Sequence, residues 1–526
     1  MLSSLSTKVR NLIFIIYSAA VSAMMLFICS ASSPAYAVNP WPDSNAFFTV
    51  GKAMANGLTV YKDIFEQKGP LLYFLHALAY DISNTGFLGV FVFEVLFLSV
   101  ALFFVYRITS LYLHDEASLV TIPLFAGVTL NTLGFYYGDS VEEFCLPFLM
   151  ISLYYFLRFL KYGDDELNGR VLILNGFLAG CAAMMKFTLV GFWFGWMAFI
   201  ALKLLFTKKV KEAFKYSFLF LLGMGISVGI WAAYFAYKGA LKDFINVYFV
   251  INATAYTVEQ TTLVSKIMNF LWVYGRTAVY DPVAFALTVL GAAMPLFIRK
   301  LTDGKFFSRI AVLFVYAMGV FTVYWGGRMY PYYFLVFNVF SVIGFAGIGM
   351  IIKKLIRKNR LRTQLSYVLC VAVLGVCVFI SAQYSQTALF TEKNKEDTPQ
   401  YKIAQYIDSH NSDGSVLMYG RLDCGAYLMN NTVPAFRHFE RQNIASERFS
   451  ENTDEQNRYI NEHLADYVVC FDLEKMSIDD ACYNQNARLK TDYELVLTAK
   501  GEIAKTEVRG RSETFNYYLF ELKEES

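Results

Sequence analysis

Residues 42–79 read PDSNAFFTVGKAMANGLTVYKDIFEQKGPLLYFLHALA. From Phe47 to Leu58 apolar residues recur every three or four positions, with Lys52 on another face, which predicts a short amphipathic helix suited to a membrane interface. Pro70 suits the first turn of a second helix, which we expect to run to Asp81. The stretch therefore predicts two short helices joined by a turn.

The composition of the whole chain indicates that most of it lies in a lipid bilayer. Of its 526 residues, 56% are hydrophobic and only 17% are charged, and the mean hydropathy is +0.40. Soluble domains carry about 25% charged residues, so this chain has too little charge to cover several soluble domains. No basic face interleaved with aromatic residues is present, which argues against nucleic acid as a partner. The eight cysteines form no CxxC motif and predict no disulfide framework.

Eleven apolar stretches have lengths close to the roughly 20 residues of a spanning helix. The first is followed by Ala35-Tyr36-Ala37, which imitates a signal-peptidase site, but its length favours a retained helix. The predicted spans are 11–30, 86–107, 118–136, 141–160, 171–185, 187–206, 216–237, 282–298, 309–325, 331–352 and 364–386.

The distribution of Lys and Arg predicts the orientation of these spans in a cell membrane. With the N-terminus in the cytoplasm, the inner loops hold 21 basic residues, including the clusters 203–215, 299–309 and 353–362, and the outer loops hold nine. This asymmetry agrees with the positive-inside rule. The stretches 31–85, 238–281 and 387–526 then become large outer segments.

The outer C-terminal segment predicts a separate domain. Short apolar runs at 415–419 and 466–471 alternate with helical stretches such as 400–409, which is typical of a small α/β domain. The predicted architecture is an all-α membrane domain at 1–386, with about 11 transmembrane helices and interfacial helices in the 31–85 loop, followed by an extracytoplasmic α/β domain at 387–526.

The 42–79 stretch resembles the first outer loop of membrane glycosyltransferases with a GT-C fold. More narrowly, it resembles the bacterial relatives of protein O-mannosyltransferases and of the lipid A aminoarabinose transferase. A second resembling segment is Gly326-Gly327-Arg328-Met329-Tyr330-Pro331-Tyr332-Tyr333. The resemblance implies transfer of a hexose or pentose from a polyprenyl-phosphate donor to a hydroxyl of an extracytoplasmic acceptor (a cell-envelope glycan, a glycolipid or a protein), with inversion at the anomeric carbon and without a nucleotide sugar.

The resemblance also implies roles for residues of the 31–85 loop. Asp43, just after the first span, is the predicted general base, and its alternative role is a helix N-cap. Lys68, just before the second helix, is a predicted ligand of the donor phosphate, and its alternative role is contact with lipid headgroups. Tyr61 is a predicted substrate-binding residue.

Charged residues near the predicted outer ends of later spans are further candidates. Glu142 is the better match to an acidic residue of similar sequences and is predicted to be catalytic, while Glu143 is a substrate-binding alternative. The alternative to a functional role is that these carboxylates are solvated at the start of a helix, where the helix dipole favours them. Lys186 and Arg328 are predicted phosphate ligands; the alternatives are a lysine that snorkels to the interface for Lys186 and an interfacial aromatic belt for the segment of Arg328. Tyr332 is a predicted substrate-binding residue; it stands where relatives have His, so it can donate a hydrogen bond but cannot act as an imidazole.

Two other function classes remain open from the residues alone. A lipid or sugar-lipid transporter should carry charges in the middle of its spans, and Glu94 is the one such residue here. A non-catalytic member of the family would bind glycan through its outer domain. The five scattered His residues predict no metal site, although a divalent cation bound by Asp43 and Glu142 is compatible with the sequence.

Overall fold

The computed structural model describes residues 5–258, 262–356, 359–392, 394–430, 432–504 and 512–524. Arg357 and Lys358 of the predicted inner basic cluster lie outside these residues. The chain forms two compact units. The helical unit comprises Met1–Cys29, Glu94–Trp231 and Val258–Ala388, and the mixed unit comprises Ser30–Phe93, Ala232–Thr257 and Leu389–Ser526. The 31–85 loop and the C-terminal residues therefore belong to one unit.

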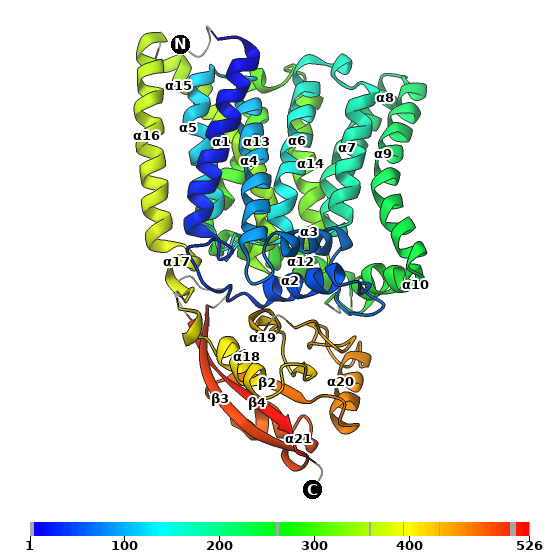
Figure 1. Cartoon of the computed structure of the whole chain (residues 1–526). Coiled ribbons are helices and arrows are strands. Elements are labelled where there is room, and N and C mark those ends of the chain that lie inside the picture. The colour runs from blue at the N-terminus through cyan, green and yellow to red at the C-terminus, as the bar shows by residue number, and fades with distance from the viewer. Residues whose placement is uncertain are drawn as a thin grey trace. The chain divides into compact units, whose positions relative to one another are not determined.

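The helical unit is a bundle of long apolar helices that run side by side (Figure 1). Its helices, two of which (α4 and α9) extend into the mixed unit, are α1 (Thr7–Cys29), α4 (Leu88–Thr109), α5 (Asp115–Leu130), α6 (Val141–Tyr162), α7 (Gly169–Ala183), α8 (Gly191–Phe206), α9 (Val210–Tyr237), α13 (Pro282–Phe297), α14 (Phe306–Tyr324), α15 (Ser341–Leu355) and α16 (Asn359–Tyr384).

Eight helices in the described part of the chain are long and apolar enough to cross a membrane, or nine if one bent pair counts as a span. This confirms the prediction of a multi-pass membrane protein. All eleven predicted spans coincide with helical segments, but the predicted count is not confirmed. The reason is length: α5, α7 and α13 have 16, 15 and 16 residues, fewer than a helix needs to span the hydrocarbon core without help.

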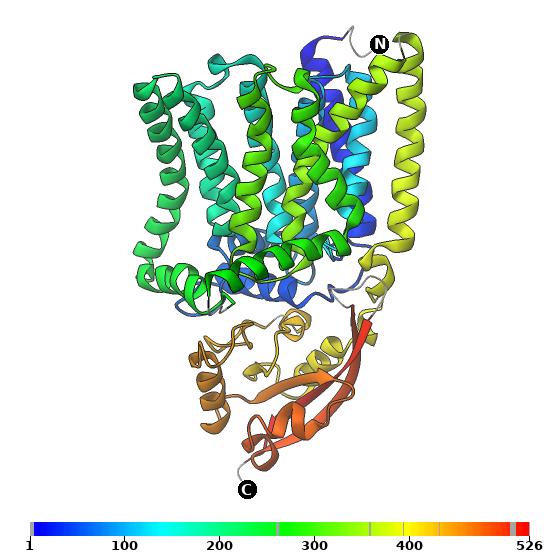
Figure 2. The same cartoon turned by 180° about the vertical axis from the view of Figure 1, so that it is seen from behind.

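The bent pair lies where a second outer loop is predicted. Helix α12 (Leu263–Tyr280) meets α13 at an angle of 116°, and Figure 2 shows it crossing the ends of the bundle helices. Pro282 begins α13, and the carboxylate of Asp281 accepts hydrogen bonds from the backbone N–H groups of Leu133 and Gly134 at 2.9 and 3.2 Å. These bonds fix the corner between the two helices.

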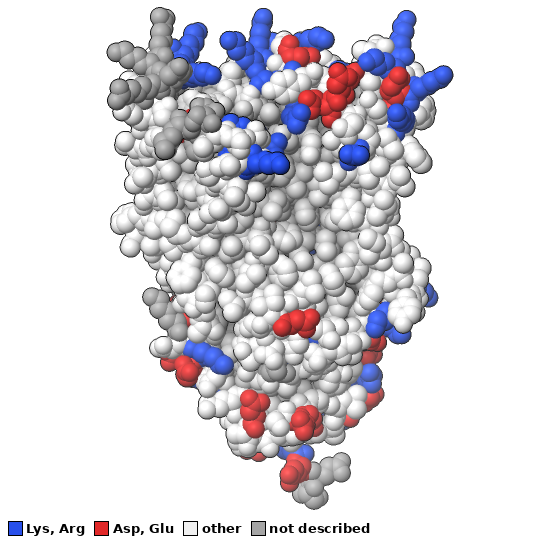
Figure 3. All heavy atoms as spheres, turned by 45° about the horizontal axis from the view of Figure 1, so that its top comes forward, with Lys and Arg blue, Asp and Glu red and all other residues white. Residues whose placement is uncertain are grey.

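Basic side chains gather at one end of the bundle, as Figure 3 shows. This end carries the junction of α8 with α9, where Lys208, Lys209 and Lys211 are exposed, and the end of α15, where Lys353 and Lys354 are exposed. Loops that the sequence assigns to one side of the membrane are therefore on one side of the bundle. That this side faces the cytoplasm remains a prediction.

The mixed unit contains the two predicted loop helices and a small sheet. The loop helices are α2 (Pro42–Ala55) and α3 (Pro70–Ile82). The sheet has the order β1-β2-β4-β3, in which β1 pairs with β2 in parallel and the other pairs are antiparallel. Its strands are β1 (Val416–Tyr419), β2 (Tyr467–Leu473), β3 (Tyr493–Ala504) and β4 (Ser512–Leu522), and its main helices are α18 (Pro399–His410), α19 (Gly425–Met429) and α20 (Glu451–Asn461).

This sheet confirms the predicted α/β character of the C-terminal residues. The runs expected at 415–419 and 466–471 are β1 and β2, and the expected helix at 400–409 is α18. A buried core that includes Leu417, Val468 and Phe520 packs between the sheet and its helices. Burial of such aliphatic and aromatic side chains is the main source of stability for a sheet of this size.

Candidate functional site

Asp43 lies in the first turn of α2. Trp41 occupies the N-cap position without a side-chain cap bond, and Pro42 is the first helical residue, so Asp43 is not the cap itself. The side chain is half-buried, and the N-terminal turn of a helix favours a negative charge. Helix α2 packs closely against α3 at Gly51: a Cβ atom at this position would lie only 2.3 Å from the Cβ atom of His76.

The polar face of α2 is not exposed, which corrects the prediction of a simple interfacial helix. Lys52 is only 1% exposed, and its Nζ donates a hydrogen bond to the carbonyl oxygen of Tyr427 in α19 at 3.0 Å. Burial lowers the pKa of Lys52 from 10.5 to about 7. The periodicity of the sequence gave no information on the C-terminal residues that cover Lys52.

The backbone around Lys68 is held by three hydrogen bonds. Its N–H donates to Oε2 of Glu66 and to the hydroxyl of Tyr73, both at 2.9 Å, and its carbonyl oxygen accepts from the Tyr61 hydroxyl at 2.6 Å. The Lys68 ammonium lies 5.4 Å from the centre of the Phe47 ring in α2. This cation–π distance places the predicted phosphate ligand beside the helix that carries Asp43.

Glu66 and Glu440 are buried carboxyl groups that were not among the predicted site residues. Burial raises the pKa of Glu66, with Asp43 adding to the rise and Lys68 opposing it. Burial raises the pKa of Glu440 well above its usual range, and Glu66 and Asp43 contribute to that rise. The shared effects show that Asp43, Glu66 and Glu440 lie within electrostatic reach of one another. A single sequence gives no signal for Glu440, which is 397 positions from Asp43.

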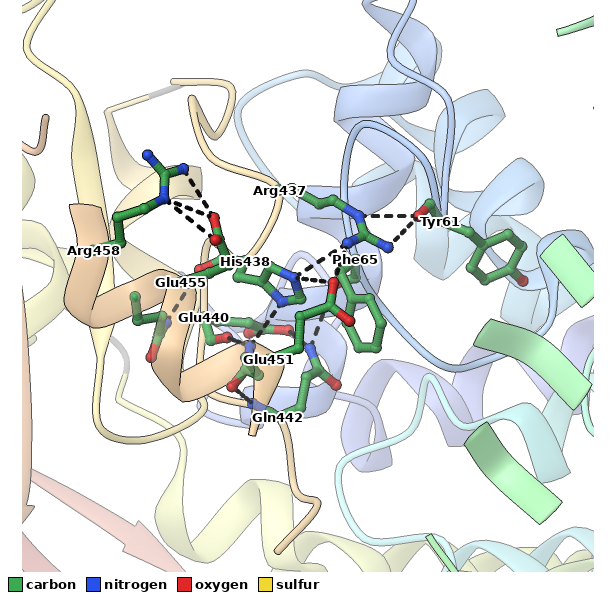
Figure 4. Close-up of polar contacts among 11 residues, drawn as sticks. Tyr61, Phe65, Arg437, His438, Glu440, Gln442, Glu451, Glu455 and Arg458 are labelled. Carbon is green, nitrogen blue, oxygen red and sulfur yellow. Dashed lines mark hydrogen bonds and ion pairs between the residues drawn. The ribbon is translucent and has the colours of Figure 1, made fainter. Parts of the chain in front are cut away.

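Figure 4 shows how the C-terminal residues hold the 61–66 segment of the loop. The Phe65 ring packs on His438 at 5.0 Å between ring centres, and the Phe65 N–H donates to the carbonyl oxygen of Arg437 at 2.8 Å. The Arg437 guanidinium in turn donates to the carbonyl oxygen of Tyr61 at 3.2 and 3.3 Å. Tyr61 has φ 72°, a left-handed conformation that is costly for a bulky residue and that surrounding contacts must enforce.

In the helical unit, the structure brings Glu142 and Lys186 together. Their side chains form a buried ion pair, with 2.5 Å between Oε1 and Nζ, and the ammonium lies 3.3 Å from the centre of the Tyr333 ring and 5.7 Å from that of Tyr332. Three predicted site residues are thus in one cluster. The contribution of Tyr333 was not predicted, because an aromatic belt residue and a cation–π partner look alike in a sequence.

Glu143 points to a different, acidic neighbourhood. It is 1% exposed and lies within electrostatic range of Glu94 and Asp139, which are both fully buried. Oε1 of Glu94 accepts a hydrogen bond from the Asp139 N–H at 2.8 Å, and Asp139 adopts φ 58°. Glu94, which the sequence left without a role, therefore fixes the turn that precedes α6 and Glu142.

Arg328 lies in the segment between α14 and the 3-10 turn Pro331–Phe340 and is half-exposed. Gly327 beside it has φ 77°, a conformation that favours glycine. The rings of Tyr330 and Tyr332 stack at 5.2 Å. In the part of the chain that the structure describes, no group of three or more His, Cys, Asp or Glu side chains could hold a metal ion.

Comparison with known proteins gives one family match. Residues 67–237 match the model of the family described as dolichyl-phosphate-mannose-protein mannosyltransferase. No curated protein sequence matches the chain. Among solved structures, the crystal structure of ArnT from Cupriavidus metallidurans bound to undecaprenyl phosphate aligns with a TM-score of 0.49 and 10% identity, over 97% of this chain and 98% of that one.

The matched segment contains Lys68, Glu142, Glu143 and Lys186. The resemblance predicted from the first loop to the protein O-mannosyltransferase group is therefore confirmed by the family match over residues 67–237.

Proposed function

We propose that this protein transfers a hexose or pentose from a polyprenyl-phosphate donor to a hydroxyl group of an extracytoplasmic glycan, glycolipid or protein. The observation that carries the proposal is the family match over 67–237, a segment that includes Lys68 and Lys186, two of the residues to which we assign phosphate binding. The multi-pass helical unit fits a lipid-linked donor, because a polyprenyl chain needs an apolar environment.

In the proposed reaction, Asp43 accepts the proton of the acceptor hydroxyl. The oxygen attacks the anomeric carbon as the bond from that carbon to the phosphate oxygen breaks, so the configuration inverts in a single displacement. Polyprenyl phosphate leaves with the negative charge, and fixed cations near that charge lower the barrier. We assign the cationic role to Lys68, Lys186 and Arg328.

The geometry of each unit supports this division of roles. Asp43 is half-buried in the first turn of α2, where a carboxylate can meet both protein and solvent. Lys186 is held by Glu142 and by the Tyr333 ring. This fits Glu142 as the residue that positions the Lys186 ammonium, and it refines the prediction that Glu142 is itself catalytic.

The proposal is tested with purified protein in nanodiscs, a panel of radiolabelled polyprenyl-phosphate sugars and a set of methyl glycosides and Ser- or Thr-containing peptides as acceptors. Release of free polyprenyl phosphate is measured for wild type, Asp43→Asn and the control Asp81→Asn, which makes the same chemical change at the exposed end of α3. We expect release by wild type and by Asp81→Asn, and a loss of about 10²–10⁴-fold in Asp43→Asn.

Equal release by all three proteins would remove Asp43 as the base. If folded wild-type protein releases no polyprenyl phosphate with any donor and acceptor, that result would count against a glycosyltransferase and for a binding or transport role.

A further inference from the structure

An apolar groove lies in the helical unit, at the end of the bundle where basic side chains gather. Its volume is about 780 Å³ including the space at its mouth. Its walls come from three helices, and the lining side chains include Val120 and Leu124 of α5, Phe345 and Ile348 of α15, and Leu369 of α16. Figure 1 shows α16 at the edge of the bundle. The proposed transfer mechanism does not use this groove.

The groove is about as long as one leaflet of a bilayer is thick. At a rise of about 1.5 Å per residue, its lining along α5 from His114 to Leu124 extends over about 15 Å. The hydrocarbon core of a bilayer is about 30 Å thick, and one leaflet provides half of it. Beyond Leu124, α16 packs directly on α5: a Cβ atom at Gly127 would lie 2.3 Å from the Cys377 sulfur. The groove therefore has room for a chain that stays within one leaflet.

Lysine side chains stand at the mouth of the groove. Lys353 of α15 lines it with an exposed side chain, and the next residue, Lys354, is also exposed. The ammonium of Lys161 in α6 lies within electrostatic range of Lys353. Like charges repel one another, and an anion beside both would offset that repulsion. The described residues that line the groove include no Asp or Glu.

Each of the two acidic residues in the first turn of α5 lies beside a basic side chain. Oδ2 of Asp115 is 3.0 Å from Nη1 of Arg10, and Oε2 of Glu116 is 3.4 Å from Nδ1 of His114. Glu116 is only 3% exposed, so its carboxylate is withheld from a ligand at the mouth. The charge that such a ligand meets is therefore positive, which favours an anionic headgroup over a zwitterionic one.

We propose that this groove binds a phospholipid with an anionic headgroup, with an acyl chain along α5 and the phosphate at Lys353. Basic pockets between membrane helices on the cytoplasmic side bind the headgroups of anionic lipids. The positive-inside rule predicts the cytoplasm for this end of the bundle, and an acyl chain of one leaflet matches the length of the groove. The binding does not depend on the transfer reaction, so its test is retention of lipid.

The test uses full-length protein in detergent and native mass spectrometry. Phosphatidylglycerol and phosphatidylcholine with identical acyl chains are titrated separately, and the apparent Kd of the first bound lipid is measured. Lys353→Gln removes the charge at the mouth, and its control is Lys305→Gln, at an 81% exposed side chain in the basic cluster 299–309. Val120→Phe narrows the groove, and its control Val368→Phe makes the same change at a 65% exposed position of α16, outside the described lining.

We expect wild type to bind phosphatidylglycerol about 5-fold more tightly than phosphatidylcholine, the factor for one lysine beside an anionic headgroup. Lys353→Gln should lose this preference and bind phosphatidylcholine as wild type does. Val120→Phe should bind both lipids about 10-fold more weakly, because the ring excludes acyl methylene groups from the groove. Both controls should bind as wild type. If Val120→Phe does not fold, the exposed Lys353→Gln decides.

Several results would overturn the proposal. Equal affinity of wild type for the two lipids, or the same loss of preference in Lys305→Gln as in Lys353→Gln, would leave only the general charge of this end. Wild-type binding by folded Val120→Phe would remove the acyl chain from the groove. Displacement of phosphatidylglycerol by inorganic phosphate at equal concentration would make a free anion the ligand. Displacement by polyprenyl phosphate at a lower concentration would make the groove a site for the carrier lipid.

Discussion

Removal of the buried ion pair between Glu142 and Lys186 should affect stability and function in different ways. The two side chains are 2% and 14% exposed. Removing one partner of a buried pair costs about 3–5 kcal/mol because the other charge stays buried, whereas replacing both partners is often close to neutral. Since Lys186 retains some exposure, we expect about 3 kcal/mol for Lys186→Met and less than about 1 kcal/mol for Glu142→Gln/Lys186→Met.

The assay follows thermal unfolding by intrinsic fluorescence in parallel with release of polyprenyl phosphate. Lys186→Met should unfold at a lower temperature, and the double variant should recover most of that loss. Neither should recover donor turnover, because both lack the cation that we assign to the leaving phosphate. Lys305→Met, whose side chain is 81% exposed, is the matched control and should behave as wild type.

Two results would refute this reasoning. If the double variant recovers turnover together with stability, Lys186 is a structural residue and the phosphate role is lost. If Lys186→Met unfolds at the wild-type temperature, the ion pair contributes nothing to the fold of the helical unit.

Three further predictions concern other contacts, each of which lies inside one unit. Because burial lowers the pKa of Lys52 to about 7, the unfolded chain binds more protons between pH 7 and 10.5, so wild-type unfolding temperature should rise with pH across that window. Lys52→Met should lose this rise and the exposed-site control Lys62→Met should keep it; an unchanged rise in Lys52→Met contradicts the assignment. Phe65→Ala should cost about 3–5 kcal/mol and speed proteolysis of the C-terminal residues, and unchanged proteolysis would speak against the packing. Tyr333→Leu removes a cation–π contact of about 0.5–2 kcal/mol to Lys186 and shrinks a buried side chain, so the unfolding temperature should fall and the KM for donor should rise about 2- to 30-fold; an unaltered KM counts against it.

Much of the fold could be predicted because helices that span a bilayer are long, continuous apolar stretches, which are easy to recognise in a sequence. Apolar length marked the helices, and Pro70 marked the start of α3. The short apolar runs before Tyr419 and before Phe471 marked β1 and β2. The long strands β3 and β4 were not predicted: Lys500 and Glu502 interrupt the pattern of β3, and the apolar run Tyr517–Phe520 of β4 was not recognised as a strand.

The sequence could indicate individual candidate residues, but it could not show which of them contact one another. Asp43 and Lys68 stand in one short motif, so a resemblance could find both. The partners of Lys186 and Lys52 lie 44 and 375 positions away along the chain, and no periodicity connects residues at such separations. Burial of Glu66 had no signal at all, since a glutamate before a turn is normally exposed.

The buried polar groups of the mixed unit bear on where its chemistry lies. Burying Lys52, Glu66 and Glu440 costs free energy that an apolar side chain of similar size would not. Perturbed ionisable groups gather at functional sites, because reactive groups need an environment that water does not provide. Here the pKa shifts of Glu66 and Glu440 share one neighbour, Asp43, and this carboxylate is itself half-buried. This arrangement fits the role of general base that we propose for Asp43.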